Sequence, residues 1–151
     1  MNGVTGSDRA ARQAAVLAAT GFAGLALFQA ALAAGASWGH AAWGGQTADL
    51  SATKQGASAV AAVVYVAAAF IVLGRAGVIR RARSDAAVFR WGTWVFAVAM
   101  AVGAVPNLAS HSRWENVIFG PLALVLAALC FVVARRAATE PKLGRPHTAA
   151  P

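Results

Sequence analysis

The chain has 151 residues, of which 59% are hydrophobic and only 12% are charged, and its formal net charge is +8 at pH 7. A typical soluble domain is about 45–50% apolar and about 25% charged, so these values indicate a membrane protein rather than a soluble one. The basic residues lie between hydrophobic stretches, as membrane topology requires, and we therefore expect no nucleic acid partner.

Four stretches of the chain contain no charged residue and no histidine. They are residues 13–39, 55–74, 91–110 and 116–134, which hold 27, 20, 20 and 19 residues. A transmembrane helix needs about 20 predominantly apolar residues to cross a hydrocarbon core of roughly 30 Å. We therefore predict an all-α fold, a four-transmembrane-helix bundle. The predicted spans are residues 13–36, 56–74, 91–109 and 115–135.

The predicted transmembrane domain covers residues 9–136. The tails, residues 1–8 and 137–151, are small and polar, so both are predicted to be disordered. An alternative interpretation treats the first span as a signal peptide, because its apolar run ends at Ala34-Gly35-Ala36, an A-x-A-like cleavage site. That run exceeds the roughly 7–15 apolar residues of a signal peptide, so we favour a retained helix.

Basic residues give the predicted orientation. Of the 13 Lys and Arg residues, all but Lys54 and Arg113 lie towards the two chain ends or in the connection 75–90. The positive-inside rule places such segments in the cytoplasm. We predict a multi-pass protein of the plasma (inner) membrane, built from two antiparallel hairpins with both termini cytoplasmic. The connections 40–54 and 109–115 then lie outside.

Residues suited to lipid headgroups flank the predicted spans. Trp38, Trp43 and Trp114 fall at the outer boundary and Trp91 at the inner one, where tryptophan is enriched. An arginine close to an anionic leaflet contributes about 1 kcal/mol to the attraction. The predicted headgroup ligands are Arg75, Arg80, Arg81, Arg83 and Arg90.

Small residues predict where the helices meet, because they allow the close approach that holds helices together in lipid. In the first span they recur at helical spacing as Ala14, Ala18, Gly21 and Gly24. Proline removes a backbone donor and favours a bend. Pro106 and Pro121 therefore predict bends near the outer ends of the third and fourth spans.

Polar side chains gather at the same outer ends. They offer amide, imidazole and carboxylate groups beside aromatic rings, which suits a shallow pocket for a small molecule or lipid. The candidate ligand-binding residues are Gln29, Trp38, His40, Asn107, His111 and Glu115. Alternatively, Gln29 forms a hydrogen bond to Tyr65 of the second span, and Asn107 satisfies carbonyl groups freed by the bend at Pro106.

Glu115 also fits a local structural role. Ser112-Arg113-Trp114-Glu115 has the S-x-x-E spacing of a capping box. In that motif the serine side chain bonds to the Glu115 amide, and Glu115 reaches back to the Ser112 amide. We favour this helix cap over a catalytic role for Glu115.

Motifs for catalysis and metal binding are missing from the sequence. Imidazole suits Zn, Cu and haem iron, but His40 and His111 come from different loops and no ligand spacing joins them. Cys130, the one cysteine, lies deep in the fourth span and can build no thiolate cluster. There is no Gly-rich phosphate loop, G-x-S-x-G or H-E-x-x-H motif. We predict no catalytic residue, no metal and no cofactor.

The two outer turns resemble known sequences. Residues 36–45 (ASWGHAAWGG) and 107–115 (NLASHSRWE), followed by Gly120-Pro121, resemble uncharacterised small four-helix integral membrane proteins of high-GC actinobacteria. The resemblance covers about residues 13–136. It implies the four-helix fold and the membrane location, and it carries over no activity and no functional residue.

Three functions fit this sequence. We favour a non-enzymatic accessory protein or subunit, which binds a membrane protein partner or further copies of itself within the lipid bilayer. The alternative is small-molecule or lipid binding or transport through an outer-leaflet pocket, and a membrane enzyme is the third. Convergence of Gln29, Asn107 and Glu115 on one cavity would favour the pocket. A filled core with Glu115 on its own helix cap would favour the subunit.

Overall fold

Four long helices account for most of the structure. The computed structural model describes residues 6–79, 82 and 84–136. Its elements are α1 (Gly6–Ala33), η1 (Gly39–Ala41), α2 (Ala52–Arg75), α3 (Ala87–Leu108), η2 (Glu115–Phe119) and α4 (Gly120–Arg136). One turn of 3-10 helix forms η1, and η2 is a π-helical segment that leads into α4. The described part of the chain contains no strand.

Each of the four long helices is long and apolar enough to cross a membrane. The candidate spans are Asp8–Ala33, Ala52–Arg75, Ala87–Leu108 and Glu115–Arg135. The predicted all-helical architecture, with four helices long and apolar enough to span a membrane, is thus confirmed for the described residues. Large hydrophobic side chains are exposed on every one of these helices, Leu27, Val63, Val98 and Val125 among them. Lipid would cover such a surface, which a soluble protein would have to bury.

Glycine ends α1. Gly35 follows the helix with φ +91, and its N–H donates to the Leu32 carbonyl at 3.1 Å, while the Ala36 N–H donates to the Ala31 carbonyl at 3.0 Å. This pair of bonds is the Schellman motif, which satisfies carbonyl groups of the last turn. The helix therefore stops before residue 36, the predicted end of the first span, although the sequence stays apolar there.

The helix starts also differ from the predicted spans. The first helix begins at Gly6, inside the segment 1–8 that was predicted to be disordered, with Asp8 in its first turn, where a negative charge favours the helix dipole. Residues 1–5 and the tail, residues 137–151, lie outside the described residues. Ser51 caps α2 by accepting a hydrogen bond from the Lys54 N–H at 3.5 Å. Helices thus extend past the charges that bounded the predicted spans.

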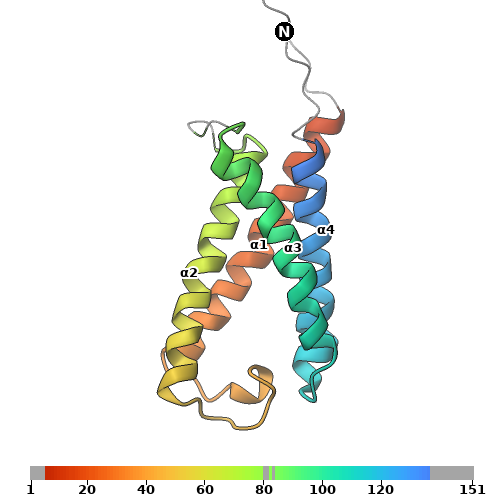
Figure 1. Ribbon diagram of the computed structural model, residues 1–151. Coiled ribbons are helices and arrows are strands. Elements are labelled where there is room, and N and C mark those ends of the chain that lie inside the picture. Colours follow the sequence, from red (N-terminus) through yellow and green to blue (C-terminus); the bar gives the residue numbers. More distant parts are fainter. Residues whose placement is uncertain (1–5, 80–81, 83, 137–151) are drawn as a thin grey trace, which may run out of the picture.

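The helices pack mainly as two pairs, α1 with α2 and α3 with α4, and α1 also contacts α4. The loop between α1 and α2 and the turn between α3 and η2 lie at one end of the molecule, here called the loop end (Figure 1). In that view the ribbons of the two pairs diverge toward the loop end.

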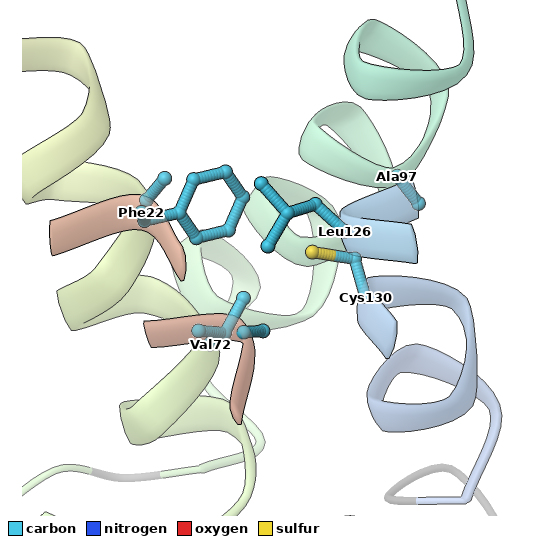
Figure 2. Close-up of a cluster of buried hydrophobic side chains, with 7 residues drawn as sticks. Phe22, Val72, Ala97, Leu126 and Cys130 are labelled. Atoms are coloured by element: carbon cyan, nitrogen blue, oxygen red, sulfur yellow. The ribbon is translucent and has the colours of Figure 1, made fainter. Parts of the chain in front are cut away.

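A hydrophobic core fills the middle of the bundle. Phe22 of α1 is fully buried, and its ring points between the helices toward Leu126 of α4 (Figure 2). The Phe22 ring centroid lies 6.1 Å from that of Tyr65 and 5.9 Å from that of Phe96. Cys130 belongs to the same cluster as a buried free thiol. All four helices therefore contribute to one packed layer.

Small residues of α1 lie where that helix meets its neighbours. Ala14 and Ala18 are buried, and a Cβ added at Gly21 would lie 2.7 Å from the Leu126 side chain. Gly24, the fourth predicted member of this face, has no neighbouring atom within 4 Å of such a Cβ. The predicted small-residue face therefore holds for the first three residues and opens toward the loop end.

The fourth span begins irregularly, next to a proline. The Gly120 N–H donates to the Glu115 carbonyl, five residues back, which is the π-helical pattern. Pro121 has no N–H for a regular helical bond, and π-bulges are a known cause of helix distortion. The fourth span thus starts with the π-helical segment η2, and the bend predicted at Pro121 stays a prediction. Pro106 lies inside α3, which continues past it to Leu108.

Candidate functional site

The loop of residues 34–51 folds back on the loop end of the bundle. The Gly39 N–H donates to the Ala48 carbonyl at 2.8 Å and so closes the loop on itself. Two side chains of the loop, Ala42 and Leu50, form a small buried cluster with Leu32 of α1. A loop with its own core and backbone bonds holds a defined shape.

A substitution at Gly39 tests whether this backbone contact holds the loop together. A Cβ at this position would lie 2.3 Å from the Thr47 carbonyl oxygen and 2.7 Å from that of Ala48. Backbone atoms cannot turn aside as a side chain can, so Gly39→Ala should lower the free energy of unfolding by about 1–3 kcal/mol. Gly56→Ala is the matched control, because its Cβ meets nothing within 4 Å. The control should be stabilised by about 0.5–1 kcal/mol, since alanine favours a helix over glycine.

Thermal unfolding in detergent compares the stability of the two variants with that of wild type. A Gly39→Ala protein as stable as wild type would contradict the close contact between Gly39 and residues 47–48.

A latch joins this loop to the second helix pair, and we define it by Trp43, Gly44, Ser110 and Glu115. The Gly44 N–H donates to both Glu115 carboxylate oxygens at 3.2 Å, and the Ser110 hydroxyl donates to Oε2 of the same carboxylate. Trp43 has φ +54, an uncommon value for a residue with a side chain. Its Nε1 donates to the buried Ser58 Oγ at 3.1 Å, which fixes the ring on α2. The latch thus connects α2, the loop and the start of the fourth span.

The capping box predicted for Ser112 and Glu115 is wrong. The Ser112 hydroxyl donates to the His40 carbonyl at 2.7 Å, and the Ser112 N–H donates to Ser110 Oγ at 3.1 Å. The Glu115 carboxylate binds Gly44 and Ser110 instead. Two polar side chains that could cap one helix therefore join two loops far apart in the sequence.

Asn116, and not Asn107, satisfies a carbonyl group at the end of α3. The Asn116 side-chain amide donates to the Leu108 carbonyl, which lies beyond the last regular helical bond. Asn107 lines the cavity described next, which is the other of its two predicted roles.

A cavity of about 380 Å³ lies between the helix pairs at the loop end. Its walls include Gln29 of α1, Trp43 of the loop, Tyr65 of α2, Asn107 of α3 and Glu115 of η2. The size falls within the roughly 300–1,000 Å³ of small-molecule sites, and a mostly apolar wall with a few polar groups is typical of them. The three polar residues whose convergence was the sign of a pocket therefore line one cavity.

Gln29, one of the residues that line this cavity, has a side-chain oxygen without a hydrogen-bond partner. Its Oε1 is buried and has no hydrogen-bond partner among the described residues. The predicted hydrogen bond to Tyr65 does not form, and the Tyr65 ring stacks on Phe22 instead. Buried polar atoms normally have partners, so an orphaned acceptor beside a cavity calls for an explanation.

The other three candidate residues lie outside this cavity. His111 lines an adjoining depression of about 320 Å³, whose wall also includes Asn107 and Glu115. Trp38 and His40 line a separate groove of about 500 Å³. The six candidate residues thus divide between the cavity, its neighbouring depression and the separate groove.

Phe28 and Phe119 separate the cavity from the groove. Their ring centroids are 4.9 Å apart, and both residues line both hollows. The groove wall also includes Trp38, Trp114 and Ile118, whose side chains are suited to lipid.

Within the part of the chain that the structure describes, no three His, Cys, Asp or Glu side chains lie close enough together to hold a metal ion. His40 Nδ1 donates to the Gly45 carbonyl at 3.0 Å and so helps to hold the loop.

The predicted headgroup arginines differ in their surroundings. Arg75 is only 4% exposed, and its Nη1 donates to the Ser84 carbonyl at 2.9 Å, so it holds the connection between α2 and α3. Arg90 is exposed, with its guanidinium 5.6 Å from the centroid of the Trp91 ring, as suits an interfacial pair. The other three, Arg80, Arg81 and Arg83, lie outside the described residues.

Sequence reasoning missed Trp43 and Ser110 as parts of this site. Trp43 precedes Gly44-Gly45, and an aromatic residue followed by two glycines signals an irregular backbone more than a membrane boundary. Ser110 carries no such signal, because its contact with Glu115 depends on where α3 ends.

Comparison with known proteins adds no homologue. No protein family, curated protein or solved structure matches this chain. The resemblance to small actinobacterial membrane proteins stays a prediction.

Proposed function

We propose that this chain is a multi-pass protein of the plasma membrane that binds a small amphiphilic molecule in the loop-end cavity, for uptake, release or sensing. Convergence of Gln29, Asn107 and Glu115 from three different elements on one hollow carries this proposal. The basic residues at the opposite end support an arrangement as two antiparallel hairpins with both termini cytoplasmic. The cavity then opens toward the outer leaflet.

The distribution of packing supports a pocket over a purely structural role. The middle of the bundle is filled by the cluster around Phe22, whereas the loop end encloses a hollow with an orphaned amide oxygen. A subunit that acts only through flat helix faces needs neither a hollow nor a carboxylate latched to the opposite loop. The observations therefore favour the binding interpretation over an accessory subunit.

A larger side chain at Gly103 tests whether the cavity binds a ligand. Gly103 lines the cavity, and a Cβ at this position would meet nothing within 4 Å, so Gly103→Leu should fill the hollow without displacing the backbone. Gly24→Leu is the matched control, because Gly24 also has open space around it but does not line the cavity. Both changes replace a helical glycine by a better helix former, so both proteins should fold.

The measurement is mass spectrometry of small molecules retained after purification in mild detergent. Wild type and Gly24→Leu should retain the same molecule in stoichiometric amount, and Gly103→Leu should retain at most about a tenth as much, because the leucine side chain occupies the cavity. If all three proteins carry the same molecules, or if none carries any, the proposal is contradicted.

A further inference from the structure

We propose that the cavity selects a protonated primary or secondary amine attached to an apolar group. This inference rests on the proposed function, because it names the ligand class of the same cavity. The observations behind it are the charge of Glu115, the orphaned oxygen of Gln29, and the absence of basic side chains from the cavity wall.

Glu115 is a buried carboxylate whose described partners are all neutral. Only 9% of the residue is exposed, and its hydrogen bonds come from the Gly44 N–H and the Ser110 hydroxyl. A buried charge is costly unless it is paired. Oε1 accepts one hydrogen bond and Oε2 accepts two, while a carboxylate has about four acceptor positions. The carboxylate can therefore accept a further bond from a cation in the cavity.

The positive charge of the chain does not reach this cavity. The net charge is +8, yet no Lys or Arg is among the described residues that line the cavity or its neighbour. His111 lines the neighbouring depression, and Arg113 lines a separate shallow pocket with Trp114, Val117 and Ile118. Glu115 therefore sets the sign of the charge facing the cavity, and an anionic ligand would be repelled.

Gln29 makes the ligand a donor of hydrogen bonds. Its Oε1 is a buried acceptor without a partner among the described residues, in a residue that lines the cavity, so a ligand donor toward which the side chain turns would satisfy it beside the carboxylate. An ammonium group with N–H bonds satisfies such acceptors, because it is a pure donor. A quaternary ammonium has the charge but no N–H, and an alcohol has a donor but no charge.

The rest of the wall fits an apolar body next to that ammonium group. Phe28, Trp43, Tyr65 and Phe119 line the cavity together with Met100. Aromatic faces attract a cation within about 6 Å of the ring centroid, and they also bury apolar surface. A cavity of about 380 Å³ accommodates a fused bicyclic ring with a short aminoalkyl arm.

Four probes that share one naphthyl ring test this assignment. They are 2-(1-naphthyl)ethylammonium, its N,N,N-trimethyl derivative, 2-(1-naphthyl)ethanol and 1-naphthylacetate. Binding to the full-length protein is measured in nanodiscs of zwitterionic phosphatidylcholine, and the signal of Gly103→Leu nanodiscs is subtracted to remove partition into lipid. The primary ammonium should bind at least about tenfold more tightly than the alcohol and the trimethyl derivative, or 1.4 kcal/mol. The carboxylate probe should bind weakest.

Two variants assign the selectivity to Glu115. Glu115→Gln keeps the shape and the acceptor for Gly44 but removes the charge, so the preference for the ammonium over the alcohol should fall to about twofold or less. Asp49→Asn removes the charge of an exposed carboxylate in the same loop, outside the cavity wall, and should keep the preference. The ranking of the probes on wild type stands even if Glu115→Gln fails to fold.

The outcomes separate the two proposals. If no probe binds wild type more tightly than Gly103→Leu, the cavity is not a binding site and the proposed function fails. If the alcohol binds as tightly as the ammonium, the cavity binds ligands but the amine assignment is overturned. Equal preference in wild type and Glu115→Gln would overturn the role of the carboxylate.

Discussion

Replacing Glu115 with alanine should lower the free energy of unfolding by about 3 kcal/mol. Hydrogen bonds to a charged group contribute about 1.5–3 kcal/mol each, and Glu115 has two donors, the Gly44 N–H and the Ser110 hydroxyl. The variant leaves both without an acceptor and frees Trp43 to leave its left-handed backbone conformation. Denaturation in mixed detergent measures the stability, and hydrogen exchange of residues 39–47 measures release of the loop.

Asp49→Ala is the control for this prediction. Asp49 is an exposed carboxylate in the same loop, and it accepts one hydrogen bond from the Ser37 hydroxyl at 2.6 Å. Its loss should cost less than about 1 kcal/mol, because exposed polar pairs compete with water. If Glu115→Ala and Asp49→Ala are equally stable, the latch does not hold the loop.

Phe22→Ala should be the most damaging change in the packed layer, at about 2 kcal/mol. The side chain is 0% exposed and contacts rings from α2 and α3. In a water-soluble core such a truncation costs about 3–5 kcal/mol. In lipid the transfer from water contributes nothing to helix association, so the lost dispersion contacts and the cavity remain as the cost.

The comparison for Phe22 is Leu27→Ala on the same helix. Leu27 is 74% exposed, so in a bilayer it contacts lipid in the folded protein. Its truncation should change stability by less than about 0.5 kcal/mol. Measured unfolding of both variants in bicelles decides the matter, and a larger loss for Leu27→Ala would mean that the outer face is an interface.

The four helices were predictable because lipid imposes one simple requirement. Twenty apolar residues without charge are long enough to span a bilayer, and each charge-free stretch corresponds to a helix. The helix ends were less predictable because apolarity does not control them. A left-handed Gly35 ends α1 inside its apolar stretch, and α1 begins before the arginines that bounded the predicted span.

Several residues of the candidate site could be predicted from the sequence, but the contacts between them could not. Gln29, Asn107 and Glu115 were identifiable as polar groups beside apolar spans, which usually face a bundle interior. The capping box for Glu115 failed because the local S-x-x-E spacing competes with contacts between distant loops. The loop reaches Glu115 only through the irregular backbone of Trp43 and Gly44. Contacts of that kind depend on the folded chain and have no fixed spacing in the sequence.

The most direct test of the outward-facing cavity is cysteine labelling in intact spheroplasts with a membrane-impermeant methanethiosulfonate. Asn107→Cys places a thiol in the cavity wall, Asp85→Cys places an exposed thiol at the opposite end, and the buried Cys130 of wild type is the blank. Asn107→Cys should react in intact spheroplasts, and Asp85→Cys only after permeabilisation. Labelling of Asp85→Cys from outside, with Asn107→Cys protected until permeabilisation, would contradict the orientation and with it the outer binding site.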